Sequence, residues 1–201
     1  MIKAIIFDWG GVLIDGILTD ILEYCADEFS HDRTEFIAMH KKYENDFQID
    51  AISEEDIWVK MAEELGKPLP AKTSLWKEAF NKFYHPKEEM FTLVKTLKKN
   101  GYKIGFLSNA EPAAMEFFHE QNYDMFHEII FSCETKLAKP DKRIFEHALK
   151  KLKVKPEEAI FIDDNADNIQ GAKATKLKAI LFQSPDQVKK ELKEKYKIKI
   201  S

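Results

Sequence analysis

The stretch Ala4-Ile5-Ile6-Phe7-Asp8-Trp9-Gly10-Gly11-Val12-Leu13 decides the fold, because an unbroken apolar run leads directly into an acid and a glycine pair. An apolar run without alternation is typical of a strand that is buried on both faces of a parallel sheet. Similar runs occur at 104–107, 128–131, 159–162 and 179–182, and helical patterns separate them. Strands that alternate with helices predict an α/β fold, a Rossmann-like parallel sheet flanked by helices.

One long segment interrupts this alternation. Between residues 15 and 85 the sequence contains helical patterns only, with candidates at 18–29, 34–45, 53–65 and 71–84. Ser53 and Asp56 have the spacing of a helix-capping pair. We therefore predict two units, a core domain formed by residues 1–14 and 86–201 and an inserted α-helical cap domain formed by residues 15–85.

The composition limits the class of protein. The chain has 201 residues, 44% of them hydrophobic and 33% charged, which is typical of a folded globular protein. The net charge of −4 argues against a general nucleic-acid binder, and no apolar run approaches a membrane span. The N-terminus lacks the pattern of a signal peptide, and Cys25 and Cys133 suit a reducing compartment. We expect a cytoplasmic monomer or homodimer without nucleic-acid or membrane partners.

Polar residues follow the predicted strands, at the edge of the sheet where open α/β folds bind ligands. They are Asp8, Ser108, Asn109, Lys139, Asp163 and Asp164. The aspartates concentrate negative charge, which calls for a hard cation such as Mg²⁺. Ser108 and Asn109 precede a helix and can cradle an anion, while Lys139 supplies a positive charge for a phosphoryl oxygen. A carboxylate beside Mg²⁺ and a bound phosphate suits covalent catalysis through an aspartyl-phosphate.

The same residues carry a resemblance to a known family. In order along the chain, the motifs Phe7–Leu13, Leu107-Ser108-Asn109, Lys139-Pro140 and Phe161–Asp164 resemble the four motifs of the haloacid dehalogenase (HAD) superfamily. The resemblance covers essentially the whole chain and includes the helical cap. The segment from Asp163 to Ala172 is similar to the branch that contains bacterial alpha-D-glucose-1-phosphate phosphatase.

The resemblance implies a role for each motif residue. Asp8 is the expected nucleophile and a Mg²⁺ ligand, and Ser108, Asn109 and Lys139 are expected to hold the phosphoryl group, with Lys139 also counted as catalytic. The expected remaining metal ligands are Asp164, Asp163 directly or through water, and the backbone carbonyl of Gly10. Residues 44–48 lie where caps of this type face the active site, which makes them candidate substrate contacts.

Gly10 departs from the usual pattern, because most phosphatases of this superfamily carry a second Asp at that position as general acid and base. The predicted function is a Mg²⁺-dependent phosphomonoester hydrolase that acts on a small phosphorylated metabolite such as a sugar phosphate. One alternative is a metal-independent haloacid dehalogenase, against which the Asp163-Asp164 pair argues. The other is a catalytically weak regulatory or binding module, which Gly10 suggests.

Smaller features of the motifs have structural interpretations. Gly11 is expected to form a tight turn only. Asp167 and Asn168 are expected to orient the loop or the start of a helix. Gly171 is expected to allow a helix to pack closely on the sheet, since glycine inside a helix otherwise costs about 1 kcal/mol.

Overall fold

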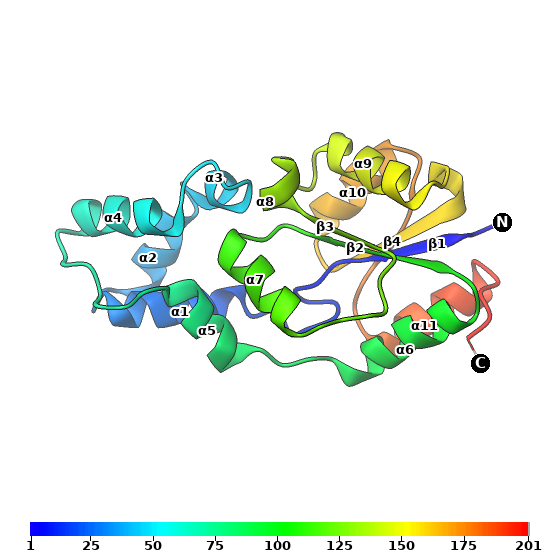
Figure 1. Ribbon diagram of the computed structural model, residues 1–201, viewed down its shortest axis with the longest axis horizontal. Helices are drawn as coiled ribbons and strands as arrows, with labels where there is room; N and C mark the ends of the chain where they lie inside the picture. Colours follow the sequence, from blue (N-terminus) through cyan, green and yellow to red (C-terminus); the bar gives the residue numbers. More distant parts are fainter. Residues whose placement is uncertain (201) are drawn as a thin grey trace.

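The computed structural model describes residues 1–200, and its centre is a five-stranded parallel sheet (Figure 1). The strands are β1 (Ala4–Phe7), β2 (Lys103–Ser108), β3 (Glu128–Phe131), β4 (Ala159–Asp163) and β5 (Lys178–Leu181). Their order across the sheet is β3-β2-β1-β4-β5, and every neighbouring pair is parallel. This confirms the predicted α/β fold and each of the predicted strands to within a residue or two.

The central strand β1 sets the register of the sheet edge. Phe7 pairs with Phe106 of β2 on one side and with Ile162 of β4 on the other. Asp8 follows directly, and its backbone N–H donates to the Ile162 carbonyl over 3.0 Å. Asp8 therefore lies level with the carboxyl ends of both neighbouring strands.

Helices cover both faces of the sheet, because alternate strand side chains point into two separate hydrophobic clusters. One face packs against α6 (Glu88–Lys99), α7 (Pro112–Glu120) and α11 (Pro185–Glu194), and the other against α9 (Lys142–Leu152) and α10 (Ala166–Ala174). The short elements α8 (Ser132–Thr135) and η1 (Pro156–Glu158) precede α9 and β4. Within residues 1–200 the helices are too short or too polar to cross a membrane.

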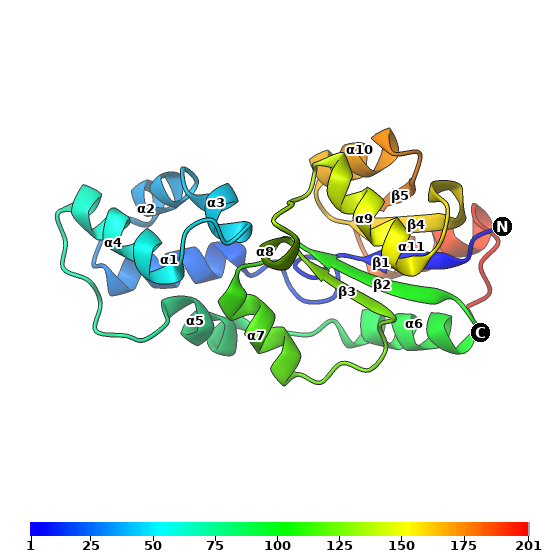
Figure 2. The ribbon, with the colours of Figure 1, turned by 45° about the horizontal axis from the view of Figure 1, so that its top comes forward.

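Five of the six helices between β1 and β2 form a cap at the carboxyl end of the sheet (Figures 1 and 2). They are α1 (Leu18–Glu28), α2 (Arg33–His40), α3 (Glu44–Gln48), α4 (Glu54–Leu65) and α5 (Leu75–Phe83). Their shared core is aromatic and contains Phe47, Trp58 and Trp76. The Ser53–Asp56 capping box at the start of α4 is present as predicted.

The predicted helix at 34–45 is wrong as a single element. The chain forms two helices there, because Lys42 and Tyr43 donate to carbonyls three residues back, which tightens the backbone into a turn after His40. The turn allows the next helix to point Phe47 into the aromatic core of the cap.

The two chain segments that join cap and core run side by side. Ile14 pairs with Pro86, and Asp15 N–H donates to the His85 carbonyl over 3.0 Å. The predicted domain boundaries at residues 14/15 and 85/86 lie where these two segments pair, and the division into two domains stays a prediction.

Candidate active site

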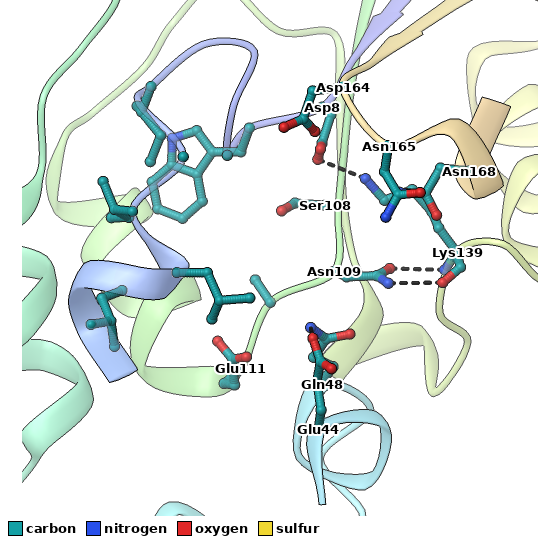
Figure 3. Close-up of a pocket in the computed structure, with 18 of the residues that line it drawn as sticks. Asp8, Glu44, Gln48, Ser108, Asn109, Glu111, Lys139, Asp164, Asn165 and Asn168 are labelled. Atoms are coloured by element: carbon teal, nitrogen blue, oxygen red, sulfur yellow. Dashed lines mark hydrogen bonds and ion pairs between the residues drawn. The ribbon is translucent and has the colours of Figure 1, made fainter. Parts of the chain in front are cut away.

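A cavity of about 880 Å³ lies between the sheet edge and the cap (Figure 3). Its lining brings together almost all the predicted site residues, Asp8, Gly10, Ser108, Asn109, Lys139 and Asp164. Asp163 lies behind this wall and is fully buried. The ends of β1, β2 and β4 and the loop before α9 thus converge on one site, as parallel strands require.

Lys139 connects two of the aspartates. Its Nζ lies 2.6 Å from Asp8 Oδ1 and 2.8 Å from Asp163 Oδ2, and all three side chains are buried. Asn109 fixes the backbone of Lys139, since its Nδ2 donates to the Lys139 carbonyl over 2.9 Å and its Oδ1 accepts from the Lys139 N–H over 2.8 Å. The Asn109 carboxamide therefore positions the lysine, and its predicted contact with a phosphoryl group stays a prediction.

The buried charges shift one another's protonation. Burial raises the pKa of Asp8, and the nearby Lys139 ammonium opposes that shift. Burial alone disfavours the charged form of Lys139, but the attraction of Asp8 and Asp163 outweighs it and raises the pKa of the lysine. Lys139 is therefore held as a cation beside the carboxylates.

The adjacent aspartates Asp163 and Asp164 have different surroundings. Asp163 Oδ1 accepts from the Asn165 N–H over 2.8 Å, and Asn168 Nδ2 lies 3.1 Å from each Asp163 oxygen. Together with Lys139, these donors occupy both oxygens of Asp163. Asp164 receives no hydrogen bond from another side chain within residues 1–200, and burial together with the charge of Asp163 raises its pKa. Asp164 is thus the acid with free oxygens, and Asn168 orients the loop as expected.

The carboxylates fit a metal ion. One oxygen from each of Asp8, Asp163 and Asp164 can be chosen so that all three lie within 4.8 Å of one another. An all-oxygen donor set of this kind suits Mg²⁺, which keeps several water ligands. The oxygens of the exposed Asp164, which accept from no other side chain within residues 1–200, and the charge of the cluster point to the same class of ion.

Gly11 has a role that sequence analysis missed. Its φ is +76°, and a Cβ added there would lie 1.9 Å from Asp164 Oδ2. Gly11 therefore forms the expected turn and also leaves the space that the Asp164 carboxylate occupies. The neighbouring Gly10 has open space at the same position.

Gly171 allows close packing, but the partner differs from the expected one. A Cβ at Gly171 would lie 2.4 Å from the Pro140 carbonyl oxygen and 3.1 Å from the ring of Phe145. At Gly171 the helix α10 therefore approaches the loop after Lys139 and α9, while Ile169 and Ala172 of the same helix pack on the sheet. Because Gly171 has no side chain, α10 can lie close to the loop after Lys139 and support it.

Ser132 is a second residue that sequence analysis missed. Its Oγ accepts from the Ala110 N–H over 2.9 Å and donates to the Gln48 carbonyl over 2.6 Å. The hydroxyl thus ties the loop after β2 to α3 of the cap. The only sequence signal was its place at the end of an apolar run.

The cap supplies the opposite wall of the cavity. Of the predicted segment 44–48, Glu44, Asn45 and Gln48 line the cavity, whereas Phe47 is buried in the cap core. Trp76 and Phe80 of α5 also line the cavity, together with residues of α1, and Phe80 stacks on Trp9 at a ring distance of 5.4 Å.

Glu111 is an unpredicted buried acid on the same cavity. It is the residue before α7, it is 5% exposed, and its side chain does not cap the helix. Burial raises the pKa of Glu111 to about 7, with smaller increases from Glu44 and Glu54. The Trp76 indole faces the carboxyl closely enough to lower that pKa, although its Nε1–H forms no well-aligned hydrogen bond.

Solved structures share this fold. A HAD family enzyme from Bacteroides thetaiotaomicron is 23% identical, with a TM-score of 0.74 over 90% of this chain and 94% of that chain. The wild-type form of that enzyme has also been solved with magnesium and inorganic phosphate, at a TM-score of 0.67.

Relatives by sequence span several activities. The chain is 26% identical to a sesquiterpene phosphatase from Aspergillus oryzae, over 86% of this chain and 85% of that protein. It is 28% identical to a drimenol cyclase from Aspergillus calidoustus over half of this chain, a match that spans only a fifth of the cyclase. A family model for haloacid dehalogenase-like hydrolases matches residues 2–175, and the chain therefore belongs to the haloacid dehalogenase-like hydrolase family.

Proposed function

We propose that the chain is a Mg²⁺-dependent phosphomonoester hydrolase that forms an aspartyl-phosphate on Asp8. The observation that carries this proposal is the Lys139 ammonium, 2.6 Å from Asp8 Oδ1 and next to the free carboxylate of Asp164. A cation beside the nucleophile attracts a phosphoryl group, and the unpaired acid suits a metal ion that binds the same group.

Each residue of the site has a part in this reaction. Asp8, Asp164 and the Gly10 carbonyl, with Asp163 directly or through water, would hold Mg²⁺, which when bound neutralises charge on the phosphoryl oxygens. A free Asp8 oxygen attacks phosphorus in line with the leaving oxygen. Lys139 and Ser108 hold the phosphoryl oxygens, and Asn109 holds Lys139 in position. Water then hydrolyses the aspartyl-phosphate and restores Asp8.

The proposed substrate is a small phosphorylated metabolite, with a sugar phosphate as the first candidate. Two observations support this class. The cap wall offers the polar side chains Glu44, Asn45 and Gln48, which can bind hydroxyl groups. The motif from Asp163 onward is similar to that of alpha-D-glucose-1-phosphate phosphatases, and an anomeric phosphate has a good leaving group that depends little on a general acid at residue 10.

Phosphate release from a panel of esters tests this function. The panel contains a sugar 1-phosphate, glyceraldehyde 3-phosphate and an isoprenyl phosphate, because similar proteins act on both small polar and apolar phosphates. We expect Mg²⁺-dependent release that Asp8→Asn lowers by at least ~10³-fold, since it removes the nucleophile. The control Asp186→Asn changes an exposed acid in α11 and should keep the wild-type rate.

Two results would contradict the proposal. Halide release from a 2-haloacid in EDTA would favour the dehalogenase alternative. Equal, negligible turnover of every ester by the wild type and by Asp8→Asn would favour a regulatory or binding module.

A further inference from the structure

The proposed reaction lacks a proton donor at the usual place. When the bond between phosphorus and the leaving oxygen breaks, an alkoxide leaves unless a nearby acid protonates it. Gly10 has no side chain, and a Cβ placed there would meet nothing within 4 Å, so no neighbouring group fills that space. Another acid on the cavity wall is needed for esters with poor leaving groups.

The leaving oxygen must lie on the side of the phosphoryl group opposite Asp8, because the displacement is in line. In Figure 3, Ser108 and Asn109 separate Asp8 from Glu111, while Glu44 and Gln48 of the cap lie on the Glu111 side. Glu111 follows Ser108 by three residues and directly precedes α7, so it lies on the short loop that leads from the end of β2 to α7. Glu111 therefore stands on the side of the cavity where the leaving group departs.

The surroundings of Glu111 favour a protonated carboxyl. No ion pair joins Glu111 to a basic side chain within residues 1–200, although Lys41 of the cap lines the same cavity. The cap acids that raise the pKa of Glu111 are Glu44 of α3 and Glu54 of α4. Both neighbours are acids and disfavour a second negative charge. Trp76 of α5 contributes only a neutral N–H. A carboxyl in such a place keeps its proton up to about neutral pH, which suits a general acid.

We propose that Glu111 is the catalytic proton donor to the leaving-group oxygen, and the proposal rests on the phosphatase function above. Asp8 Oδ forms a bond to phosphorus while the bond to the leaving oxygen breaks, and the Glu111 O–H proton moves to that oxygen, which leaves as an alcohol. Glu111 is now a carboxylate. It takes a proton from the water that attacks phosphorus, and cleavage of the aspartyl-phosphate releases inorganic phosphate and restores both acids.

A comparison of two leaving groups tests this role. A poor leaving group such as that of an alkyl phosphate needs the proton, whereas p-nitrophenyl phosphate releases a stable anion. We expect Glu111→Gln to lower kcat/KM for the alkyl ester by ~10²-fold and for the aryl ester by less than ~5-fold. The control Asn45→Ala changes an uncharged side chain on the cap wall of the same cavity and should change the rates on both substrates by the same factor.

A second arm adds an acid at residue 10. In the Glu111→Gln background, Gly10→Asp should recover at least ~10-fold of the lost rate on the alkyl ester, because a general acid there does the same task. A merely structural role of Glu111 predicts no such recovery. Equal losses on both esters, or no rescue, would overturn the proposal.

The wild-type protein gives a measurement that needs no variant. Activity on the alkyl ester should fall as pH rises above about 7, where Glu111 loses its proton, and this fall should be absent for the aryl ester. Identical profiles would contradict the assignment. If the wild type releases no phosphate from either ester, the proposed function itself fails. If release depends on Asp8 but Glu111→Gln leaves it unchanged, only the role proposed for Glu111 fails.

Discussion

The two ends of the active-site cavity treat their buried polar groups differently. At the sheet end, Lys139 pairs with Asp8 and Asp163, and Asp163 has donors to both of its oxygens. At the cap end, Glu111 has no ionic partner within residues 1–200, and the buried Trp76 Nε1 makes no hydrogen bond. The paired charges of Lys139 and Asp163 hold a fixed geometry, whereas the unpaired groups at the cap end stay available to a ligand. In the proposed reaction the sheet end would hold the phosphoryl group, and the cap end would face the leaving group.

The largest effect should come from breaking the paired end. Lys139→Met leaves Asp8 and Asp163 buried beside each other without a cation, which should lower the free energy of unfolding by about 3–5 kcal/mol. The control Lys136→Met breaks an exposed pair with Asp50 and should cost less than about 1 kcal/mol. Urea denaturation of both variants measures the difference. Equal losses of unfolding free energy in the two variants would show that the buried ion pairs of Lys139 contribute no more to stability than the exposed pair of Lys136.

Adjacent glycines offer the next comparison. Gly11→Ala forces an L side chain into a left-handed backbone and against Asp164, so we expect a loss of about 3 kcal/mol and weaker Mg²⁺ activation. Gly10→Ala enters open space and should change stability by less than about 1 kcal/mol. Thermal unfolding and the Mg²⁺ dependence of phosphate release check both. Matching behaviour of the two variants would contradict the role given to Gly11.

The unpaired Glu111 at the cap end should make the free energy of unfolding depend on pH. The pKa of Glu111 is raised from 4.5 to about 7, so between these values the unfolded chain has already lost a proton that the folded chain keeps. Folding stability should therefore fall as pH rises through this window. Relative to Glu111→Gln, the wild type should lose about 2 kcal/mol between pH 5 and pH 8. A pH-independent difference in urea denaturation would argue against a buried, protonated acid.

The smallest effect concerns the contact between the two ends. Ser132→Ala removes a hydroxyl that bridges Ala110 and Gln48, which should cost about 1 kcal/mol and raise KM, because the cap loses one hydrogen-bonded link to the loop after β2. The exposed Thr92 in α6 provides a control, since Thr92→Ala breaks no such bridge. An unchanged KM for Ser132→Ala would show that the bridge does not order the cap.

The sheet end could be predicted from the sequence, because its signals are local. Apolar runs mark the strands, and parallel strands bring the residues after them to one edge. These local signals predict that Asp8, Ser108, Lys139 and Asp164 lie at one edge of the sheet, and all four line the cavity. The sequence does not predict the two hydrogen bonds between the Asn109 carboxamide and the Lys139 backbone, because they depend on the path of a distant loop.

The cap end could not be predicted in the same way. Glu111-Pro112 has the local pattern of an ordinary helix start, and its burial opposite cap residues such as Glu44 and Trp76 appears only in the folded chain. Ser132 likewise gains its meaning from Gln48, a residue 84 positions away in the chain. Contacts of this range leave no trace in local composition, so sequence patterns alone could not show them.

The bridge between Ile14 and Pro86 brings the two ends of the cap insertion together, so the cap can be replaced as one unit. Both ends of the insertion meet at one point, so its length and sequence can change without altering the register of β1 against β2. Loop-closure cost rises only slowly with length, which makes large changes between these two residues affordable. A lineage can therefore redesign the pocket for a new leaving group while the phosphate chemistry is inherited unchanged.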